Sequence, residues 1–174
     1  QPLQALQLFN AALRKQATDH TMQEMLLHES EALESMGKLL HALLDISKLE
    51  GGNLKPELED INLAELCQAL RQQFASVAEA RGLTLQFDAG AHYIHTDRTL
   101  FRQLLENLLA NAMKYTEAGS VQLTCRPQGD GLRITVADTG IGISPENLQH
   151  IFNEFYQVQR NGRKGVGLGL AIVK

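Results

Sequence analysis

The chain has 174 residues, with 16 Lys and Arg against 20 Asp and Glu, and therefore a formal net charge of −4. This balance argues against nucleic-acid binding by charge alone, and a composition with 44% hydrophobic and 21% charged residues excludes disordered and collagen-like chains. Cys67 and Cys125 are far apart and form no C-x-x-C pair, which fits a reducing compartment and excludes a cysteine zinc site. No apolar run is long enough to span a membrane. We therefore expect a cytoplasmic chain that contacts neither membrane nor nucleic acid.

Glycine usage divides the sequence, because only Gly37 of the 14 glycines precedes residue 51. We place a domain boundary at Gly51-Gly52, between domains at 1–50 and 51–174. In the first domain, apolar residues recur at three- and four-residue steps, which predicts two helices joined near Thr18-Asp19-His20. The second helix carries a heptad seam interrupted by Glu29, with another apolar stripe beside it. A lone hairpin cannot bury both stripes, which favours a homodimer that closes a four-helix bundle. The alternative is a hairpin packed on its own second domain.

Residues 51–174 alternate between short strands and helices, the pattern of an α/β or α+β domain. We expect strands near 58–63, 83–87, 121–126 and 132–137, and helices over 64–80, 97–115 and 145–155. Asp97 is a plausible N-cap, and Gly129-Asp130-Gly131 turns the last two strands into a hairpin. Residues 156–167 indicate a mobile loop that leads into another helix from Leu168. That helix is short at the chain end, so we expect native sequence beyond Lys174.

Asn107 and Asn111 lie four residues apart in the helix expected at 97–115, and therefore on one face. Asn is a modest helix former, so two of them in a Leu-rich helix suggest that polar oxygens are needed at the edge of the core. A carboxamide oxygen can bind Mg²⁺ while phosphates and waters complete the octahedron. The alternative is a pair of solvated or capping residues.

A second motif, Asp138-Thr139-Gly140-Ile141-Gly142-Ile143, directly follows a predicted strand. A carboxylate at a strand end can accept a hydrogen bond from an exocyclic amine, and the glycines let the backbone approach a flat ring. The third glycine of a dinucleotide fingerprint is replaced by Pro145, which excludes that reading. The alternative is a simple Asp-x-Gly turn.

A third motif, Gly165-Val166-Gly167-Leu168-Gly169-Leu170, runs into a predicted helix N-terminus, where exposed amides favour an anion. Arg163 and Lys164 add positive charge just upstream. No G-x-x-x-x-G-K-[ST] string exists, which excludes a Walker-type loop. Taken alone, the segment could be a flexible linker.

In this order and spacing, the motifs resemble the N, G1, F and G2 boxes of the sensor histidine kinase catalytic domain. The N box resembles 107–116, the G1 box 138–143 and the G2 box 165–174, and Ile151-Phe152-Asn153-Glu154-Phe155 resembles the F box. The helical hairpin resembles the dimerisation and histidine-phosphotransfer domain of the same family. The resemblance implies an α+β protein: a hairpin, a four-helix bundle as a dimer, followed by an ATP-binding α/β sandwich of the histidine kinase and gyrase type.

The resemblance also implies ATP and Mg²⁺ as cofactors. Asn111 would coordinate the metal, Asn107 would support it, and Lys114 would contact phosphate. Tyr115 would pack on the adenine or sugar, and Asp138 would accept from the adenine amino group. Phe152 and Phe155 would anchor a lid, while Arg163 and Lys164 could reach the phosphates. The implied nucleotide-binding set is Asn107, Asn111, Lys114, Tyr115, Asp138, Gly140, Gly142, Phe152, Phe155, Arg163, Lys164, Gly165, Gly167 and Gly169.

Hydrolytic relatives of this fold carry a Glu general base at the position of Asn107, and an amide cannot take a proton from water. Glu106 is adjacent but points about 100° away on a helix. A histidine acceptor is itself the nucleophile and needs no such base. The resemblance therefore favours a kinase whose parent enzyme phosphorylates its own histidine and then a response regulator aspartate. The alternatives are an ATPase of the same fold and a dimerising nucleotide-binding module without transfer activity.

Gln1-Pro2 resembles the end of the family's acceptor motif, which places the acceptor histidine upstream of Gln1. Because the sequence also lacks an initiator Met, we expect a fragment that cannot phosphorylate itself. None of its histidines has the required following Pro, and we treat all as surface or packing residues: His20, His28, His41, His92, His95 and His150. His92 and His95, in a segment that could be strand or loop, are spaced like metal ligands but have no third ligand.

Overall fold

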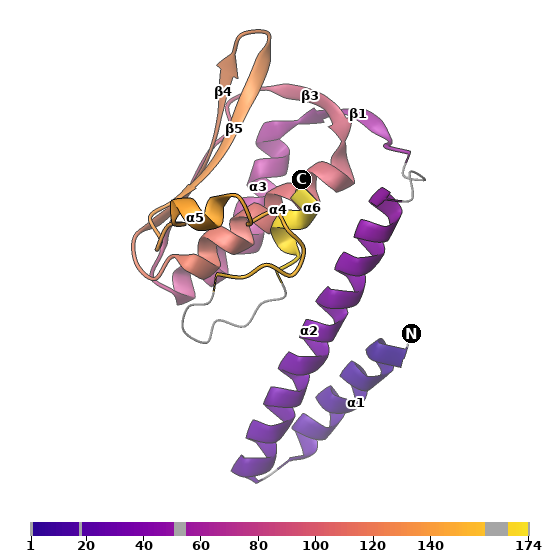
Figure 1. Cartoon of the computed structure of the whole chain (residues 1–174). Helices are drawn as coiled ribbons and strands as arrows, with labels where there is room; N and C mark the ends of the chain where they lie inside the picture. Colours follow the sequence, from indigo (N-terminus) through magenta and orange to yellow (C-terminus); the bar gives the residue numbers. More distant parts are fainter. Residues whose placement is uncertain (1, 18, 51–54, 159–166, 174) are drawn as a thin grey trace. The chain divides into compact units, whose positions relative to one another are not determined.

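The computed structural model describes residues 2–17, 19–50, 55–158 and 167–173 (Figure 1). It divides into two compact units, the first formed by Gln1–Leu54 with Asn153–Leu168 and the second by Lys55–Phe152 with Gly169–Lys174. The first change of unit falls after Leu54, near the expected boundary at Gly51-Gly52, which itself lies outside the described residues. Asn153–Leu168, expected in the second domain, is grouped with the first unit.

The first unit is built on two helices, α1 (Pro2–Gln16) and α2 (His20–Glu50), joined where the sequence predicts. The Asp19 carboxylate accepts a hydrogen bond from the Met22 amide at 3.1 Å and so caps the start of α2. The Gln23 side chain donates to the Ala17 carbonyl at 2.8 Å, which fixes the connection from the other side. Arg14 and Lys15 lie in the last turn of α1, where positive charge complements the helix dipole.

A polar contact crosses the seam of this hairpin. Asn10 is only 3% exposed, and its amide donates to the Leu26 carbonyl at 3.0 Å and to the Glu29 carboxylate at 3.2 Å. Leu26 and Leu33 of α2 are also buried. Glu29 therefore interrupts the apolar seam because Asn10 faces it from α1, and a buried polar contact of this kind favours one register of the two helices.

The second unit contains a mixed three-stranded sheet in the order β2-β4-β5 and a separate β1–β3 pair. The first two sheet strands, β2 (Thr84–Asp88) and β4 (Ser120–Gln128), run parallel, and β5 (Gly131–Asp138) is antiparallel to β4. A turn at Gly129-Asp130 joins β4 to β5, with Gly129 at a φ of 57°. The β1 (Leu58–Asn62) and β3 (Tyr93–Asp97) strands pair antiparallel, which settles as strand the segment that the sequence left open.

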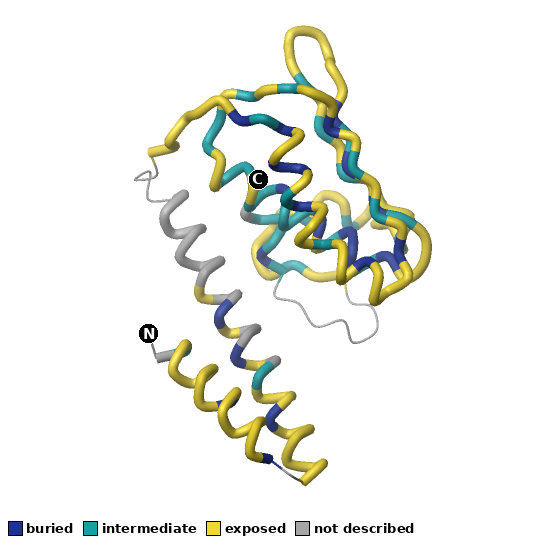
Figure 2. Tube along the Cα trace, turned by 180° about the vertical axis from the view of Figure 1, so that it is seen from behind, coloured by how far each residue is buried: buried dark blue, intermediate teal, exposed yellow. Residues whose placement is uncertain are grey.

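Two long helices, α3 (Leu63–Ala80) and α4 (Arg98–Tyr115), close the core of the second unit. The strand β4 buries alternate residues, Val121, Leu123 and Cys125, while Gln122 and Arg126 stay exposed. Figure 2 shows the buried positions (dark blue) along the helices and strands of this unit. Burying one such leucine contributes about 1.5–3 kcal/mol, so this core holds α4 firmly. The largest fully buried side chains of the core are Ile61, Leu63, Leu70, Leu105, Leu109, Val121, Leu123 and Cys125.

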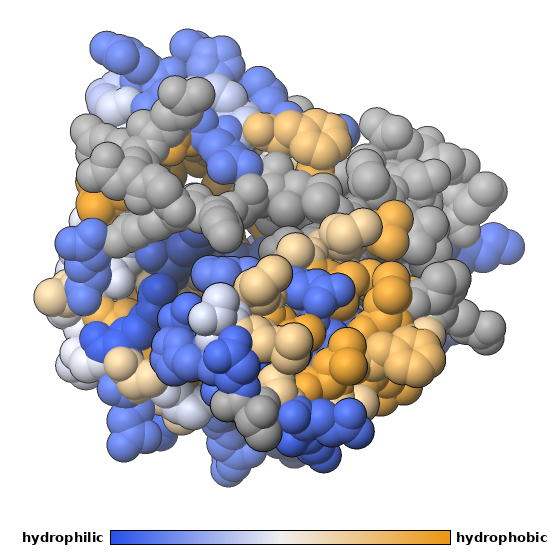
Figure 3. Space-filling view, turned by 90° about the horizontal axis from the view of Figure 1, so that it is seen from below, coloured by the Kyte–Doolittle hydropathy of each residue, from blue (hydrophilic) through white to orange (hydrophobic). Residues whose placement is uncertain are grey.

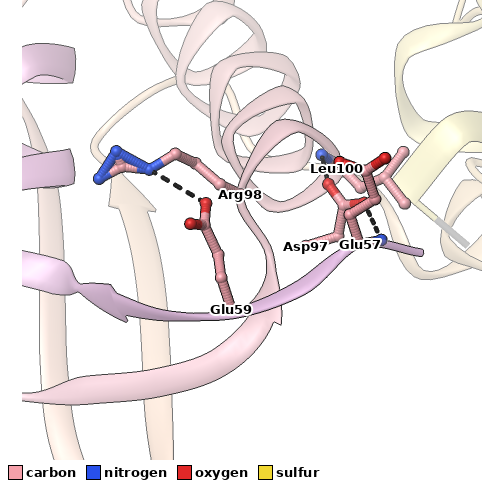
Figure 4. Close-up of polar contacts among 5 residues, drawn as sticks. All are labelled: Glu57, Glu59, Asp97, Arg98 and Leu100. Carbon is pink, nitrogen blue, oxygen red and sulfur yellow. Dashed lines mark hydrogen bonds and ion pairs between the residues drawn. The ribbon is translucent and has the colours of Figure 1, made fainter.

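The start of α4 is fixed by Asp97, as the sequence predicts (Figure 4). One carboxylate oxygen accepts from the Leu100 amide at 3.0 Å, and the other accepts from the Glu57 amide at 2.8 Å. These backbone donors lower the pKa of the Asp97 carboxyl. The next residue, Arg98, lies 3.6 Å from the Glu59 carboxylate, so both residues tie α4 to β1 and the segment just before it.

We predict that Asp97→Ala lowers the melting temperature by a few degrees at neutral pH and removes an acid-sensitive part of the stability. A carboxyl whose pKa is depressed in the folded state stabilises the fold above its unfolded pKa and loses that contribution as pH falls through the folded value. The difference in melting temperature between wild type and variant should therefore shrink as pH falls below the ordinary Asp pKa of about 3.9. Thermal unfolding followed by circular dichroism at pH 7 and pH 3 checks this. An equal difference at both pH values would contradict it.

The helix expected over 145–155 is wrong in its length. The observed helix α5 (Pro145–Leu148) has four residues, and turns follow it. The bonds beyond it span three residues, as from the His150 amide to the Asn147 carbonyl at 2.9 Å. Phe155 has a φ of 59°, a left-handed conformation that no α-helix accommodates. The last helix, α6 (Gly169–Val173), begins one residue later than predicted, and 159–166 of the expected mobile loop lie outside the described residues.

Among the described residues, no helix combines the length and the apolar character needed to cross a membrane.

Candidate functional site

The last turns of α4 carry four of the predicted site residues, and all four are half-buried: Asn107, Asn111, Lys114 and Tyr115. The two asparagine amides lie close to the start of α6. A Cβ atom at position 169 would be 3.5 Å from Asn107 Oδ1 and 3.7 Å from Asn111 Nδ2. Gly169 therefore brings the backbone of α6 to the two amides without covering them with a side chain.

The amide oxygens at this place suit a hard cation that takes most of its ligands from phosphate and water and few from the protein. Among the residues that the structure describes, no three His, Cys, Asp or Glu side chains are grouped to hold a metal ion. A cation at this part of α4 could take the amide oxygen of Asn111, with Asn107 one turn earlier in support. Mg²⁺ is often bound in this way, with few protein oxygens and the rest supplied by phosphate and water. The two amide atoms of Asn111 can exchange places by a flip, so its oxygen can face the ligand.

Asp138 lies at the end of β5 with its side chain exposed. Its Oδ1 accepts a hydrogen bond from the Gly140 amide at 2.8 Å, which closes a local Asx-type turn. This bond holds the carboxylate in one orientation, and its other oxygen can accept from a ligand N–H group. A carboxylate oriented in this way can accept a hydrogen bond from an exocyclic amine.

The turn after Asp138 is seated directly against the C-terminus of α4. The Ile141 amide donates to the Tyr115 carbonyl at 3.2 Å. A Cβ atom at Gly140 would run into that carbonyl and would also lie 2.7 Å from Asp138 Oδ1. Only glycine fits this position without moving the turn away from α4. The contact between the turn and the helix therefore requires a glycine here, whether or not a ligand is bound.

Two threonines that the sequence analysis did not single out as site residues brace the same region. The Thr139 hydroxyl accepts from the Ser120 amide at 2.9 Å, and its own amide donates to the Ser120 carbonyl at 3.1 Å. Thr116 is buried, and its hydroxyl donates to the Ala112 carbonyl at 2.8 Å. Thr116 directly follows the predicted helix at 97–115, and Thr139 lies two residues after the predicted strand at 132–137. That proximity was the available sequence signal.

Lys114 and Tyr115 contact each other on the last turn of α4. The Lys114 ammonium lies 4.9 Å from the centre of the Tyr115 ring, a cation–π distance. Tyr115 also accepts the backbone bond from Ile141, so the positive charge and the aromatic ring lie next to the turn that follows Asp138. A ring and a cation side by side suit a ligand that has both a flat and an anionic part.

The other predicted residues are distributed over both units. In the second unit, Gly142 has a φ of 66° and open space around it, and Phe152 is exposed. In the first unit, Gly167 has a φ of 76°, and a Cβ there would lie 2.7 Å from the backbone carbon of Phe155. The structure therefore groups Asn107, Asn111 and Gly169, and it groups Tyr115, Asp138 and Gly140. Arg163, Lys164 and Gly165 lie outside the described residues.

Residues 96–174 match the family model described as histidine kinase-, DNA gyrase B- and HSP90-like ATPase. Over 168 residues the chain is 33% identical to the sensor histidine kinase CusS of Escherichia coli. The alignment covers 94% of this chain and 35% of that relative. The chain contains a sensor histidine kinase catalytic domain. The alginate biosynthesis sensor protein KinB of Pseudomonas aeruginosa is 35% identical over 147 residues, which is 83% of this chain and 24% of that relative.

Solved structures agree with a histidine kinase domain. The crystal structure of full-length ShkA in complex with AMPPNP matches with a TM-score of 0.81 and 27% identity, over 99% of this chain and 37% of that one. The Acinetobacter baumannii histidine kinase AdeS shares the fold, with a TM-score of 0.71 at 24% identity. The chain spans about a third of the length of the curated relatives CusS and KinB or less. The mixed α/β fold with a helical N-terminus is thus confirmed for this histidine kinase domain.

Proposed function

We propose that the second unit binds Mg²⁺-ATP at the C-terminal end of α4. We further propose that the parent kinase transfers the γ-phosphoryl group to a histidine and then to an aspartate of a response regulator receiver domain. One observation supports this most directly. The Ile141–Tyr115 backbone bond ties the Asp138 turn to the same helix that presents Asn107 and Asn111. Base recognition and phosphate binding would then share one rigid support.

In this proposal the adenine amino group donates to Asp138, whose orientation is preset by the Gly140 amide. Gly140 and Gly142 leave room for the ring, and Tyr115 packs beside it. Lys114 and the segment containing Arg163, Lys164 and Gly165 would supply positive charge to the triphosphate, and Gly169 would leave room for it beside the two amides. Mg²⁺, held by Asn111 with support from Asn107, would neutralise the phosphate oxygens. Gly167, Phe152 and Phe155 would belong to the lid that covers the nucleotide.

Transfer to a histidine fits the residues of α4 better than hydrolysis does. Glu106 is the carboxylate closest in sequence to the amide pair, but it accepts from Arg102 Nε at 2.8 Å as an i,i+4 ion pair. Asn107 cannot accept a proton from water. A histidine acceptor is itself a nucleophile, so phosphoryl transfer requires only positioning and charge neutralisation. Steady phosphate release from ATP by this chain would instead favour the ATPase alternative.

The acceptor belongs to a motif that none of the chain's six histidines matches, so we expect nucleotide binding by this chain without phosphorylation of itself. Phosphotransfer is therefore measured with a longer chain of the parent kinase that contains the acceptor motif. If that chain binds ATP but its histidine is not phosphorylated, the dimerising nucleotide-binding module replaces the kinase as the function.

The hairpin supports a homodimer, because its apolar residues remain largely exposed. Phe9 and Met25 are each 68% exposed. Figure 3 shows apolar (orange) side chains gathered into a patch next to hydrophilic (blue) surface. A groove of about 610 Å³ between α1 and α2 is lined by Ala11, Leu27 and several polar residues. A second hairpin could cover this surface and complete a four-helix bundle. The exposed apolar residues of the hairpin are Leu6, Leu8, Phe9, Leu13, Met22, Met25, Leu27, Met36 and Leu40.

The dimer is tested with Phe9→Glu, which puts a charge on this exposed apolar surface. We expect the wild-type chain to elute as a dimer and the variant to shift to the monomer mass at micromolar concentration, since an unpaired charge in a helix interface costs several kcal/mol. Light scattering coupled to size exclusion measures the mass. Gln7→Ala, an exposed polar residue of the same helix that does not line the groove, is the matched control. A wild-type chain that remains monomeric at 100 μM, about its highest working concentration, would refute the dimer.

Nucleotide binding is tested by calorimetric titration with AMPPNP and Mg²⁺. We expect saturable binding by wild type and about tenfold weaker binding by Asp138→Ala, because one hydrogen bond to a charged acceptor is lost. Asp130→Ala, an exposed aspartate in the β4–β5 turn, is the control and should bind like wild type. A folded wild-type chain that does not bind AMPPNP would contradict the proposed site. Equal binding by Asp138→Ala would remove Asp138 from it.

A further inference from the structure

The C-terminus of α4 is held by a side chain from outside the motifs described above. Arg81 follows the last residue of α3, and its guanidinium donates to the Met113 carbonyl at 2.5 Å. The donor and acceptor are 32 residues apart in sequence. Arg81 therefore links the end of one core helix to the last turn of the helix that carries Lys114 and Tyr115.

This contact supplies a partner that the helix itself cannot. The last four carbonyls of an α-helix have no intrahelical donor and need partners from elsewhere. At the end of α4, the Ala112 carbonyl accepts from both the amide and the hydroxyl of Thr116, and the Tyr115 carbonyl accepts from the Ile141 amide. The Met113 carbonyl, between them, accepts from Arg81. A guanidinium also places positive charge at the negative end of the helix dipole.

The backbone of Arg81 is held in place by the end of α3, so its side chain extends from a fixed position. It is the C-cap of α3, and Gly82 follows with a φ of 65°. The Gly82 amide donates to the Glu79 carbonyl at 3.0 Å, and the Leu83 amide donates to the Ala78 carbonyl at 2.9 Å. These two bonds form a Schellman motif, with Leu83 and Ala78 both buried. The backbone beneath Arg81 is therefore set by the core and not by the nucleotide site.

We propose that Arg81 is a positioning residue for the nucleotide site, because its bond to Met113 fixes the last turn of α4 on which Tyr115 and the Asp138 turn depend. The inference rests on the proposed ATP site and extends it. In this proposal Arg81 does not contact the nucleotide. It acts through the Met113 carbonyl and keeps the Tyr115 carbonyl where the Ile141 amide can reach it.

The test measures amide hydrogen exchange and AMPPNP affinity on the same variants of the chain. For Arg81→Ala we expect exchange at the Ile141 amide to become about tenfold faster relative to the Leu109 amide, which reports the core of the same helix. We expect AMPPNP binding to weaken about tenfold, since the Asp138 turn loses the fixed position of its partner, the Tyr115 carbonyl. Arg81→Lys retains a cationic donor and should recover part of both effects.

The controls separate positioning from general stability and from failure of the ATP site. Arg71→Ala removes an exposed arginine from the same helix α3 and should leave both readouts unchanged. If Arg81→Ala accelerates exchange at Ile141 and Leu109 equally, or matches Arg71→Ala, Arg81 is not a positioning residue. If wild type binds no AMPPNP, the proposed function fails instead, whatever the exchange data show.

Discussion

Replacing Asn111 with alanine is expected to weaken Mg²⁺-ATP binding by about 100-fold, because the variant loses the one protein oxygen assigned to the metal. The described residues offer no cluster of acidic or histidine ligands that could take over. The residue is half-buried one turn after Asn107, and its amide lies near Gly169. Without that oxygen, Lys114 would be the only proposed group among the described residues of α4 that offsets the negative charge of the triphosphate. Calorimetric titration with AMPPNP in the presence and absence of Mg²⁺ measures the loss.

The Mg²⁺ dependence identifies the cause of this loss. Wild type should bind AMPPNP much more weakly in EDTA, whereas Asn111→Ala should bind equally weakly with and without the metal. Gln72→Ala, an exposed amide on α3, is the matched control and should behave as wild type. If Asn111→Ala keeps its full Mg²⁺ dependence while its melting temperature matches wild type, the metal is held by other residues.

Much of the second unit could be predicted because its signals are local. Asp97 caps α4 where the sequence predicts, since an acidic side chain directly before a Leu-rich periodic segment can accept from the first free amides of the helix. Gly129-Asp130 turns the β4–β5 hairpin because glycine supplies the positive φ, here 57°. The i,i+4 spacing of Asn107 and Asn111 likewise puts both amides at one place on α4.

The remainder depends on contacts between distant residues, which spacing does not report. Arg81 and Met113 are 32 residues apart, and nothing in the sequence near either one predicts the bond. The helix expected through Phe155 ends at Leu148, because later residues adopt turns and one left-handed conformation that periodicity cannot reveal. Asn10 shows the same limit in the hairpin, since Glu29 reads as an interruption of the seam until its partner on α1 is seen.

The contacts at the C-terminus of α4 give a physical reason for the proposed site to lie there. The interior of a helix has no free backbone N–H or C=O groups, whereas its last turn leaves carbonyls that other elements must satisfy. In this chain the partners are the Asp138 turn, through the Ile141 amide, and Arg81. The need to complete the backbone hydrogen bonds thus brings the two sequence motifs together. Any change that separates the turn from this carbonyl should therefore damage the proposed site even when both motifs are intact.

Gly140→Ala makes that change and is expected to weaken AMPPNP binding by more than about tenfold. The added methyl group would collide with the Tyr115 carbonyl, a backbone atom that cannot rotate away, and would crowd Asp138 Oδ1 at 2.7 Å. Overpacking of this kind costs about 1–3 kcal/mol, so the turn should move off α4 and the variant should also melt earlier. Titration with AMPPNP, together with exchange at the Ile141 amide, measures the displacement.

Two other glycines separate this collision from the ordinary cost of adding a side chain. Gly142 has a φ of 66° with no atom near its Cβ position, so Gly142→Ala should cost about 1 kcal/mol of strain but leave the Ile141 bond in place. At Gly131 a Cβ would lie 3.8 Å from the Gln128 carbonyl, an ordinary contact, so Gly131→Ala should be nearly neutral. If Gly140→Ala binds AMPPNP as well as Gly131→Ala does, the contact between the turn and α4 is not what holds the site together.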